Sequence, residues 1–165
     1  MNNLTLSITT IGDLLLRQTI TITDNGEPIK GVKLCVPIYQ RPYKWTARNA
    51  NQLLDDIIDA KNSNKERYRV GTLILHKAKG KNLYDIVDGQ QRTTFLYILL
   101  KYLKFDGEFN IRYDIRRKSG EYLEDIINKR LEPTQEEYQD IHFFNKTLDT
   151  ITSILESKSI EKSKI

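Results

Sequence analysis

Residues 83–94 have the sequence LYDIVDGQQRTT, and a largely apolar run, Phe95 to Leu103, follows them. The apolar residues of 83–87 predict a strand, and the apolar run predicts a helix. An acid and a glycine, Asp88 and Gly89, therefore lie at a strand-to-helix junction. Glycine permits a tight turn, and the free amides at a helix N-terminus favour a bound anion. This junction is the first candidate site.

The remaining pattern predicts a small mixed sheet covered by helices, an α/β fold, because strands come first and helices last with some alternation. Alternating apolar residues predict the other strands, at 4–8, 18–23, 32–36, 70–76 and 109–115. Residues 18–36 are expected to form one hairpin, with a turn signal at Asn25-Gly26. Basic and polar residues at 77–82 are expected to join the strands on either side as a second hairpin. Apolar stripes predict the other helices, at 11–17, 46–60 and 119–127, and a last helix that follows Thr134 and extends to about Leu155. The expected N-terminal caps are Thr10, Thr46 and Ser119, and Thr134 with Glu137 fits a capping box.

The length of 165 residues predicts one domain, which we place at 1–157 with a helical C-terminal part at 118–157. The polar tail, 158–165, is expected to be a truncation point. The single cysteine, Cys35, excludes an intramolecular disulfide framework and a cysteine-rich zinc site. The sequence has neither a signal-peptide pattern nor an apolar run of about 20 residues, so a cytoplasmic protein without membrane association is expected.

The positions of the basic residues say more about a possible ligand than the net charge of +4 does. Five cations and no acid lie between Glu27 and Asp55, and residues 39–45, YQRPYKW, interleave aromatic with basic side chains. That combination suits phosphates and stacked bases. The candidate DNA contacts are Tyr43, Lys44, Trp45 and Arg48. The alternative is that the aromatic side chains pack on the core while the cations are solvated.

Arg92 is unusual at the first candidate site, because a cation in the first turn of a helix opposes the helix dipole. A bound phosphate would reverse that penalty. Hydrogen-bond donors suited to phosphate or sugar surround it, at Gln90, Gln91, Thr93 and Thr94. The alternative is structural: Asp88 caps the helix and Arg92 pairs with an acid. The sequence contains no Walker A and no GxGxxG motif.

Both candidate segments resemble motifs of the GmrSD restriction endonuclease N-terminal domain family. The similar segments, in order, are 36–45 (VPIYQRPYKW), 52–57 (QLLDDI), 70–75 (VGTLIL), 85–94 (DIVDGQQRTT) and 113–116 (YDIR). The resemblance extends from about Leu6 to Leu155. It implies a ParB/sulfiredoxin-like α/β fold that binds a nucleoside triphosphate, with Mg²⁺ expected as well. It also implies a regulatory role toward an HNH-type nuclease in a phage-defence system that restricts modified DNA.

The resemblance further implies roles for individual residues. The expected nucleotide-binding residues are Gln40, Arg41, Gly89, Gln90, Gln91, Arg92, Thr93 and Thr94. The expected catalytic residues are Asp88, Gln91 and Arg92, and Asp88 is also the candidate metal ligand. In this interpretation the helix N-terminus after Gly89 and the guanidinium of Arg92 hold phosphates, while Arg41 adds charge from across the cleft.

Three questions stay open from the sequence. The two histidines, His76 and His142, are too scattered for an HNH site, so a nuclease is expected in a further domain or a separate subunit. The nucleotide could be hydrolysed or only sensed, and an oligomer is an open alternative. The competing functions are a non-enzymatic DNA-binding module and a protein-interaction module. The latter would present an exposed apolar stripe on the last helix, at Phe143, Phe144 and Leu148.

Overall fold

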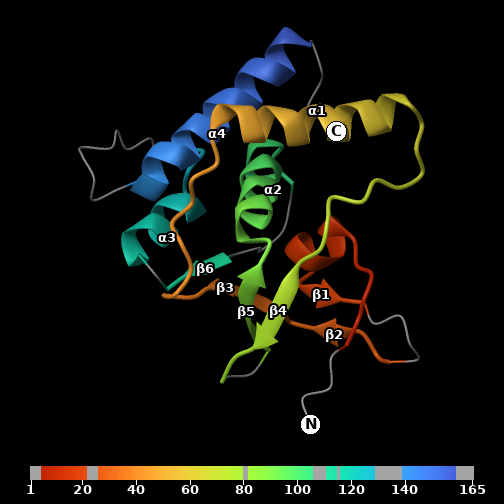
Figure 1. Cartoon of the computed structure of the whole chain (residues 1–165), viewed down its shortest axis with the longest axis vertical. Helices are drawn as coiled ribbons and strands as arrows, with labels where there is room; N and C mark the ends of the chain where they lie inside the picture. Colours follow the sequence, from red (N-terminus) through yellow and green to blue (C-terminus); the bar gives the residue numbers. More distant parts are fainter. Residues whose placement is uncertain are drawn as a thin grey trace.

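The computed structural model describes residues 5–21, 26–79, 82–105, 111–114, 116–128 and 139–158. These residues form a mixed α/β fold, as predicted, and its strands lie in two sheets (Figure 1). The strands are β1 (Thr19–Ile20), β2 (Ile29–Lys30), β3 (Lys33–Val36), β4 (Ile74–Lys77), β5 (Leu83–Asp88) and β6 (Ile111–Tyr113). The helices are η1 (Gly12–Leu16), α1 (Ala47–Asn62), α2 (Gln90–Tyr102), α3 (Arg117–Glu124) and α4 (Gln139–Ser157).

The larger sheet has the order β4-β5-β3-β6, with β3 parallel to both β5 and β6. The register aligns Leu34 with Tyr84 on one side and with Ile111 on the other. All three side chains are buried, and they form part of the hydrophobic core. The antiparallel pairing of β4 with β5 confirms the hairpin expected around residue 80. Because β3, β5 and β6 are parallel, their carboxyl ends lie at one edge of the sheet.

The predicted single hairpin over residues 18–36 is only partly correct. β1 pairs antiparallel with β2 in a separate two-stranded sheet. The chain then turns at Gly31, which has a φ of 69°, and β3 enters the larger sheet. The apolar side chains of β3 explain the difference, since Leu34 and Val36 are buried in the core that the larger sheet provides.

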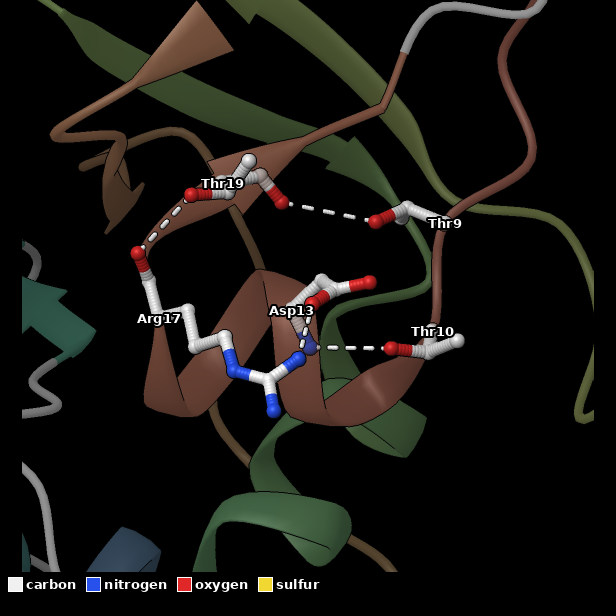
Figure 2. Close-up of polar contacts among 5 residues, drawn as sticks. All are labelled: Thr9, Thr10, Asp13, Arg17 and Thr19. Carbon is white, nitrogen blue, oxygen red and sulfur yellow. Dashed lines mark hydrogen bonds and ion pairs between the residues drawn. The ribbon is translucent and has the colours of Figure 1, made fainter. Parts of the chain in front are cut away.

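The predicted strand at 4–8 is also wrong for residues 5–8, which are in no strand. The predicted helix that follows them is confirmed, with one π-helical turn, η1. Thr10 Oγ1 accepts the Asp13 amide at 2.9 Å, Arg17 pairs with Asp13 at 2.7 Å, and Thr9 bonds the Thr19 carbonyl (Figure 2). These contacts fix the turn that leads into β1.

Helix α2 is the central helix of the molecule. Figure 1 shows it running from the end of β5 toward α1 and α4, and α4 contacts α1, α2 and α3. The side chains from Thr93 to Leu100 are all buried, as expected for a helix with neighbours on every side. α2 begins at Gln90, so the predicted start at Phe95 was five residues too late. The residues of its first turn are polar, so the apolar pattern did not indicate the helix start.

Smaller differences concern the other elements. Thr46 is the N-cap of α1, as predicted, and α4 confirms the last helix. The predicted strand 70–76 is reduced to β4. Ser119 is not a cap, because α3 begins at Arg117 and the Ser119 hydroxyl donates to Asp140. The expected capping box at 134–137 and residues 159–165 of the tail lie outside the described residues. Within the described part, no helix is long and apolar enough to cross a bilayer.

Candidate functional site

The two candidate segments meet where β3, β5 and β6 end. The loop 37–46 follows β3, Gly89 and α2 follow β5, and Asp114 follows β6. Gln40 Nε2 donates to the Val87 carbonyl at 2.8 Å, so the loop contacts the end of β5 directly. Ligands of open α/β sheets bind at the carboxyl ends of parallel strands. This edge is therefore the candidate site.

The start of α2 has the features that favour an anion. Gly89 is its N-cap with a φ of 94°, no side chain caps the helix, and its first turn contains no acid. A β-carbon on Gly89 would lie 2.9 Å from Leu73 Cδ1 and 3.2 Å from the Thr72 carbonyl. The predicted need for glycine is thus explained by the closely packed segment 72–73. Asp88 is exposed at the end of β5 and is not the cap.

Gln91 holds the loop from the first turn of α2. Its Oε1 accepts the Lys44 amide at 2.8 Å, and its Nε2 donates to the Pro42 carbonyl at 3.1 Å. Nε2 also lies 3.3 Å from Gln90 Oε1. The side chain is buried, so these contacts are shielded from water. Gln91 therefore joins α2 to the loop that carries Arg41.

Arg92 holds a different segment. Its Nη1 donates to the Val70 carbonyl at 2.9 Å and its Nη2 to the Thr72 carbonyl at 3.4 Å. The guanidinium lies against Gly71, where a β-carbon would be 1.5 Å from Nη1. The partners are carbonyl oxygens rather than the acid that the structural alternative predicted. They supply partial negative charge beside a cation that the helix dipole disfavours.

The other polar residues in the first two turns of α2, Gln90, Thr93 and Thr94, are buried. Thr93 Oγ1 donates to the Gly89 carbonyl at 3.0 Å, and Thr94 Oγ1 lies 2.8 Å from the Tyr113 hydroxyl. Gln90 Nε2 is buried and has no hydrogen-bond partner in the described part of the chain. Burial raises the pKa of Tyr113 well above its ordinary value. The predicted set thus divides into an inner group that supports the site and an outer group at its surface.

The outer group is the exposed part of the site. Arg41 and Asp88 are exposed, and Gln40, Gly89 and Arg92 are partly exposed. Two of the candidate DNA contacts, Lys44 and Arg48, are exposed as well. These residues are the ones that a dissolved ligand could reach without a rearrangement of the core.

Two aromatic residues of the loop belong to the core. Tyr43 is fully buried, its hydroxyl lies 2.9 Å from Thr147 Oγ1, and its ring centroid lies 5.2 Å from that of Phe144. The ring of Trp45 is partly buried and stacks on Phe95 at 5.5 Å. The alternative of core packing is confirmed for both. Tyr43 as a DNA contact is wrong, because no face of its ring is exposed.

Asp140, in the first turn of α4, is a residue of this site that the sequence analysis missed. Its Oδ1 accepts the Tyr43 amide at 2.6 Å. Its Oδ2 accepts the Ser119 hydroxyl at 3.1 Å and Arg116 Nη1 at 3.4 Å. Burial raises the pKa of the Asp140 carboxyl, although the three donors oppose that effect. An acid in the first turn of a helix is common, so the sequence around Asp140 carries no specific signal.

Three further features of the structure concern helix α4, the single cysteine and possible metal-binding groups. Helix α4 packs on its own domain: Phe144 is fully buried, and Phe143 and Leu148 are packed against the core. The exposed apolar stripe that the interaction-module alternative predicted at these three residues is therefore not found. The Cys35 side chain is fully buried, and this burial raises the pKa of its thiol to about 12. Among the described residues, no three His, Cys, Asp or Glu side chains form a metal-binding group.

The chain matches a known protein family. The family model of the GmrSD restriction endonuclease N-terminal domain matches residues 21–164, which is most of the chain. The match includes both segments at the candidate site, the loop after β3 and the start of α2. The comparison with curated proteins gives no match.

Proposed function

Because the chain belongs to the GmrSD restriction endonuclease N-terminal domain family, we propose that it is the nucleotide-binding regulatory domain of a DNA-targeting restriction system. The observation that carries this proposal is the uncapped start of α2, at the edge where three parallel strands end. Such an edge is the usual ligand site of parallel α/β sheets, and free helix amides attract phosphate. The proposed ligand is a nucleoside triphosphate.

The residues present fit a triphosphate. Arg41 is an exposed cation on the loop that contacts the end of β5, and the first turn of α2 contains no acid that would repel phosphate. Gln90 is buried and would support these exposed residues from the core. Arg41 would hold the terminal phosphates and stabilise negative charge as it develops there.

The proposed Mg²⁺ also has a suitable ligand. Asp88 is an exposed carboxylate at the end of β5, next to the start of α2. Mg²⁺ usually binds one or two carboxylates together with substrate phosphates, so a cluster of protein ligands is not required. When bound, the ion would neutralise phosphate charge, and Asp88 would hold it or orient a water molecule.

Four residues of the motif have supporting roles in this proposal. Gln91 and Arg92, which the family resemblance suggested as catalytic, use their side-chain groups on the backbones of residues 42–44 and 70–72. They would set the shape of the site, and Thr93 and Thr94 would support it from the core. The exposed residues Arg41 and Asp88 would meet the ligand.

Calorimetry of the intact protein with ATP and GTP in the presence of Mg²⁺ tests the proposal. Arg41→Ala should weaken binding roughly 10-fold or more, since hydrogen bonds to charged groups contribute about 1.5–3 kcal/mol. Arg17→Ala is the matched control. Arg17 pairs with Asp13, and its neighbour Gln18 bonds Val32 at the opposite end of β3. Absence of triphosphate binding would overturn the proposal, and equal affinities would overturn the role of Arg41. Phosphate release measured in the same samples distinguishes hydrolysis from sensing.

The nuclease of the system is proposed to lie outside the described residues. His76 is on β4 and His142 on α4, and both side chains are exposed and far apart in the topology. We therefore propose that nucleotide occupancy is communicated to an HNH-type nuclease domain or subunit in phage defence. Co-expression with such a partner, followed by nuclease assays with and without triphosphate, tests this part.

DNA binding is a second candidate function, favoured by exposed cations. They are Lys44, Arg48, Lys65, Arg67, Arg69, Lys77 and Lys79. Binding of a DNA duplex without nucleotide should weaken steeply with salt if these side chains contact phosphates. A Lys44→Ala, Arg48→Ala double variant should then reduce the salt slope by about two. An unchanged slope would exclude these two cations from the interface.

A further inference from the structure

Polar side chains from two distant helices hold the backbone that directly follows Arg41. The Tyr43 amide donates to Asp140 Oδ1 at 2.6 Å, and the Lys44 amide donates to Gln91 Oε1 at 2.8 Å. On the other side of Arg41, the Gln40 side chain donates to the Val87 carbonyl. Arg41 therefore lies between anchored residues, although its own side chain is exposed.

Asp140 is the most specialised of these anchors. Its side chain has no exposed surface, and a buried charge is unfavourable unless it is well hydrogen-bonded. An acid in the first turn of a helix could interact with the helix dipole from an exposed position. Asp140 instead directs Oδ1 to the loop, while Ser119 and Arg116 bind Oδ2. Three structural elements, the loop, α3 and α4, thus meet at one carboxylate.

We propose that Asp140 is a positioning residue of the candidate site. By holding the Tyr43 amide it fixes the loop, and through the loop it fixes Arg41 beside the start of α2. The effect on ligand affinity rests on the proposed triphosphate binding, whereas the effect on the loop does not. The two parts can therefore be tested separately.

Thr147 provides a matched control on the same helix. It is fully buried, and its hydroxyl contacts the same residue, Tyr43, but at the side-chain hydroxyl rather than the backbone. Thr147→Val removes that hydrogen bond with little change in shape and leaves the amide on Asp140. Asp140→Asn is the conservative variant. Its carbonyl oxygen can still accept the Tyr43 amide, and the Ser119 hydroxyl can reverse to accept from the new amide group.

Amide hydrogen exchange followed by NMR tests the loop. Asp140→Ala should speed exchange of the Tyr43 amide at least 10-fold relative to amides inside α2. Asp140→Asn and Thr147→Val should leave that ratio near the wild-type value. An unchanged Tyr43 amide in Asp140→Ala, or an equal effect of Thr147→Val, would overturn the proposal. If the alanine variant does not fold, Asp140→Glu, which displaces the carboxylate but keeps its charge, should show the same selective change.

A double-mutant cycle with Arg41 tests the effect on binding. Asp140→Ala should weaken binding of the Mg²⁺ complex of ATP or GTP about 5- to 10-fold in the wild-type background. It should have little effect in an Arg41→Ala background, because the loop then positions no guanidinium. Equal losses in both backgrounds would contradict positioning through Arg41. If wild-type protein binds no triphosphate, the proposed function fails, and the exchange experiment still decides the role of Asp140 in the loop.

Discussion

Gly71 and Arg92 fit together only because Gly71 has no side chain. A β-carbon there would lie 1.5 Å from Nη1 and 2.7 Å from Cζ of Arg92, and the φ of 127° disfavours any other residue. We predict that Gly71→Ala lowers the free energy of unfolding by about 2–4 kcal/mol. That range combines backbone strain of about 1–3 kcal/mol with the loss of the hydrogen bonds to Val70 and Thr72. Urea denaturation measures it.

The Arg92→Ala variant separates the two causes. Alone, Arg92→Ala should lower the free energy of unfolding by about 1–2 kcal/mol. It removes the two hydrogen bonds but introduces no backbone strain at residue 71. Combined with Gly71→Ala, it should cost less than the sum of the two single variants, since the displaced guanidinium is then absent. Strict additivity would show that the two residues do not share this space.

Asp140 should make stability depend on pH. Burial is the main reason that its pKa lies above the ordinary value of 3.8, so the folded protein holds this proton more tightly than the unfolded chain. The free energy of unfolding should therefore fall as pH rises from about 4 through the folded-state pKa. Asp140→Asn lacks that proton and should lose this part of the dependence. Urea denaturation of both proteins at several values between about pH 4 and about pH 7 measures this dependence. If the free energy of unfolding changes with pH equally in both proteins, the prediction is wrong.

At the residue scale, the role of a residue could be predicted where it depends on its neighbours in the sequence. Residues 88–92 stand out because an acid, a glycine and a cation at a helix start are unusual neighbours. The role of Gln91 was not predictable, because its partners are backbone atoms 47 and 49 positions away. Asp140 is 97 positions from Tyr43, and nothing in its local sequence distinguishes it from an exposed acid.

At the scale of the element, the junction of β5 with α2 shows that a local sequence pattern can predict the order of elements but not their exact bounds. Its order, strand then glycine then helix, was predicted and is confirmed. The helix start was misplaced because residues 90–94 are polar, and polar residues normally indicate a surface turn. Here Gln90, Gln91, Thr93 and Thr94 are all buried. The loop provides hydrogen-bond partners for Gln91, and β6 provides one for Thr94.

Gly89 should be essential to this junction. With a φ of 94°, and with Leu73 Cδ1 only 2.9 Å from an added β-carbon, Gly89→Ala is expected to cost about 2–4 kcal/mol from strain and displacement of the segment 72–73. Gly12→Ala is the control, because its β-carbon would meet only Thr10 Oγ1 at 3.9 Å. That change should be neutral or slightly stabilising. Similar losses in both variants would contradict a special requirement at Gly89.

At the scale of the whole molecule, the class of fold was predictable and the long-range pairings were not. Alternation identified residues 32–36 as a strand but not its partners. The local turn signal at Asn25-Gly26 favoured pairing within residues 18–36. The structure pairs β3 with β5 and β6 instead, because those strands supply the buried surface that Leu34 and Val36 require. That preference is a tertiary effect.

Helix α4 contacts α1, α2 and α3, and its core residues also pack against the loop and β6. A change to one of these core residues should therefore destabilise the whole fold. Phe144 is fully buried, and its ring lies 5.2 Å from Tyr43 and 5.8 Å from Tyr113, which belong to the loop and to β6. Phe144→Ala should cost about 3–5 kcal/mol, the usual range for a buried phenylalanine. Phe143→Ala is the matched control and should cost less, because Phe143 is only partly buried.

The single tryptophan, Trp45, can show whether this loss is cooperative. It stacks on Phe95 near the start of α1, so its fluorescence reports the loop, whereas far-UV circular dichroism reports all helices. Because α4 contacts α1, α2 and α3, we expect both signals of Phe144→Ala to shift to the same lower urea midpoint in one transition. If Trp45 changed before the helices unfolded, α4 would stabilise the loop separately, and the domain would not unfold as one unit.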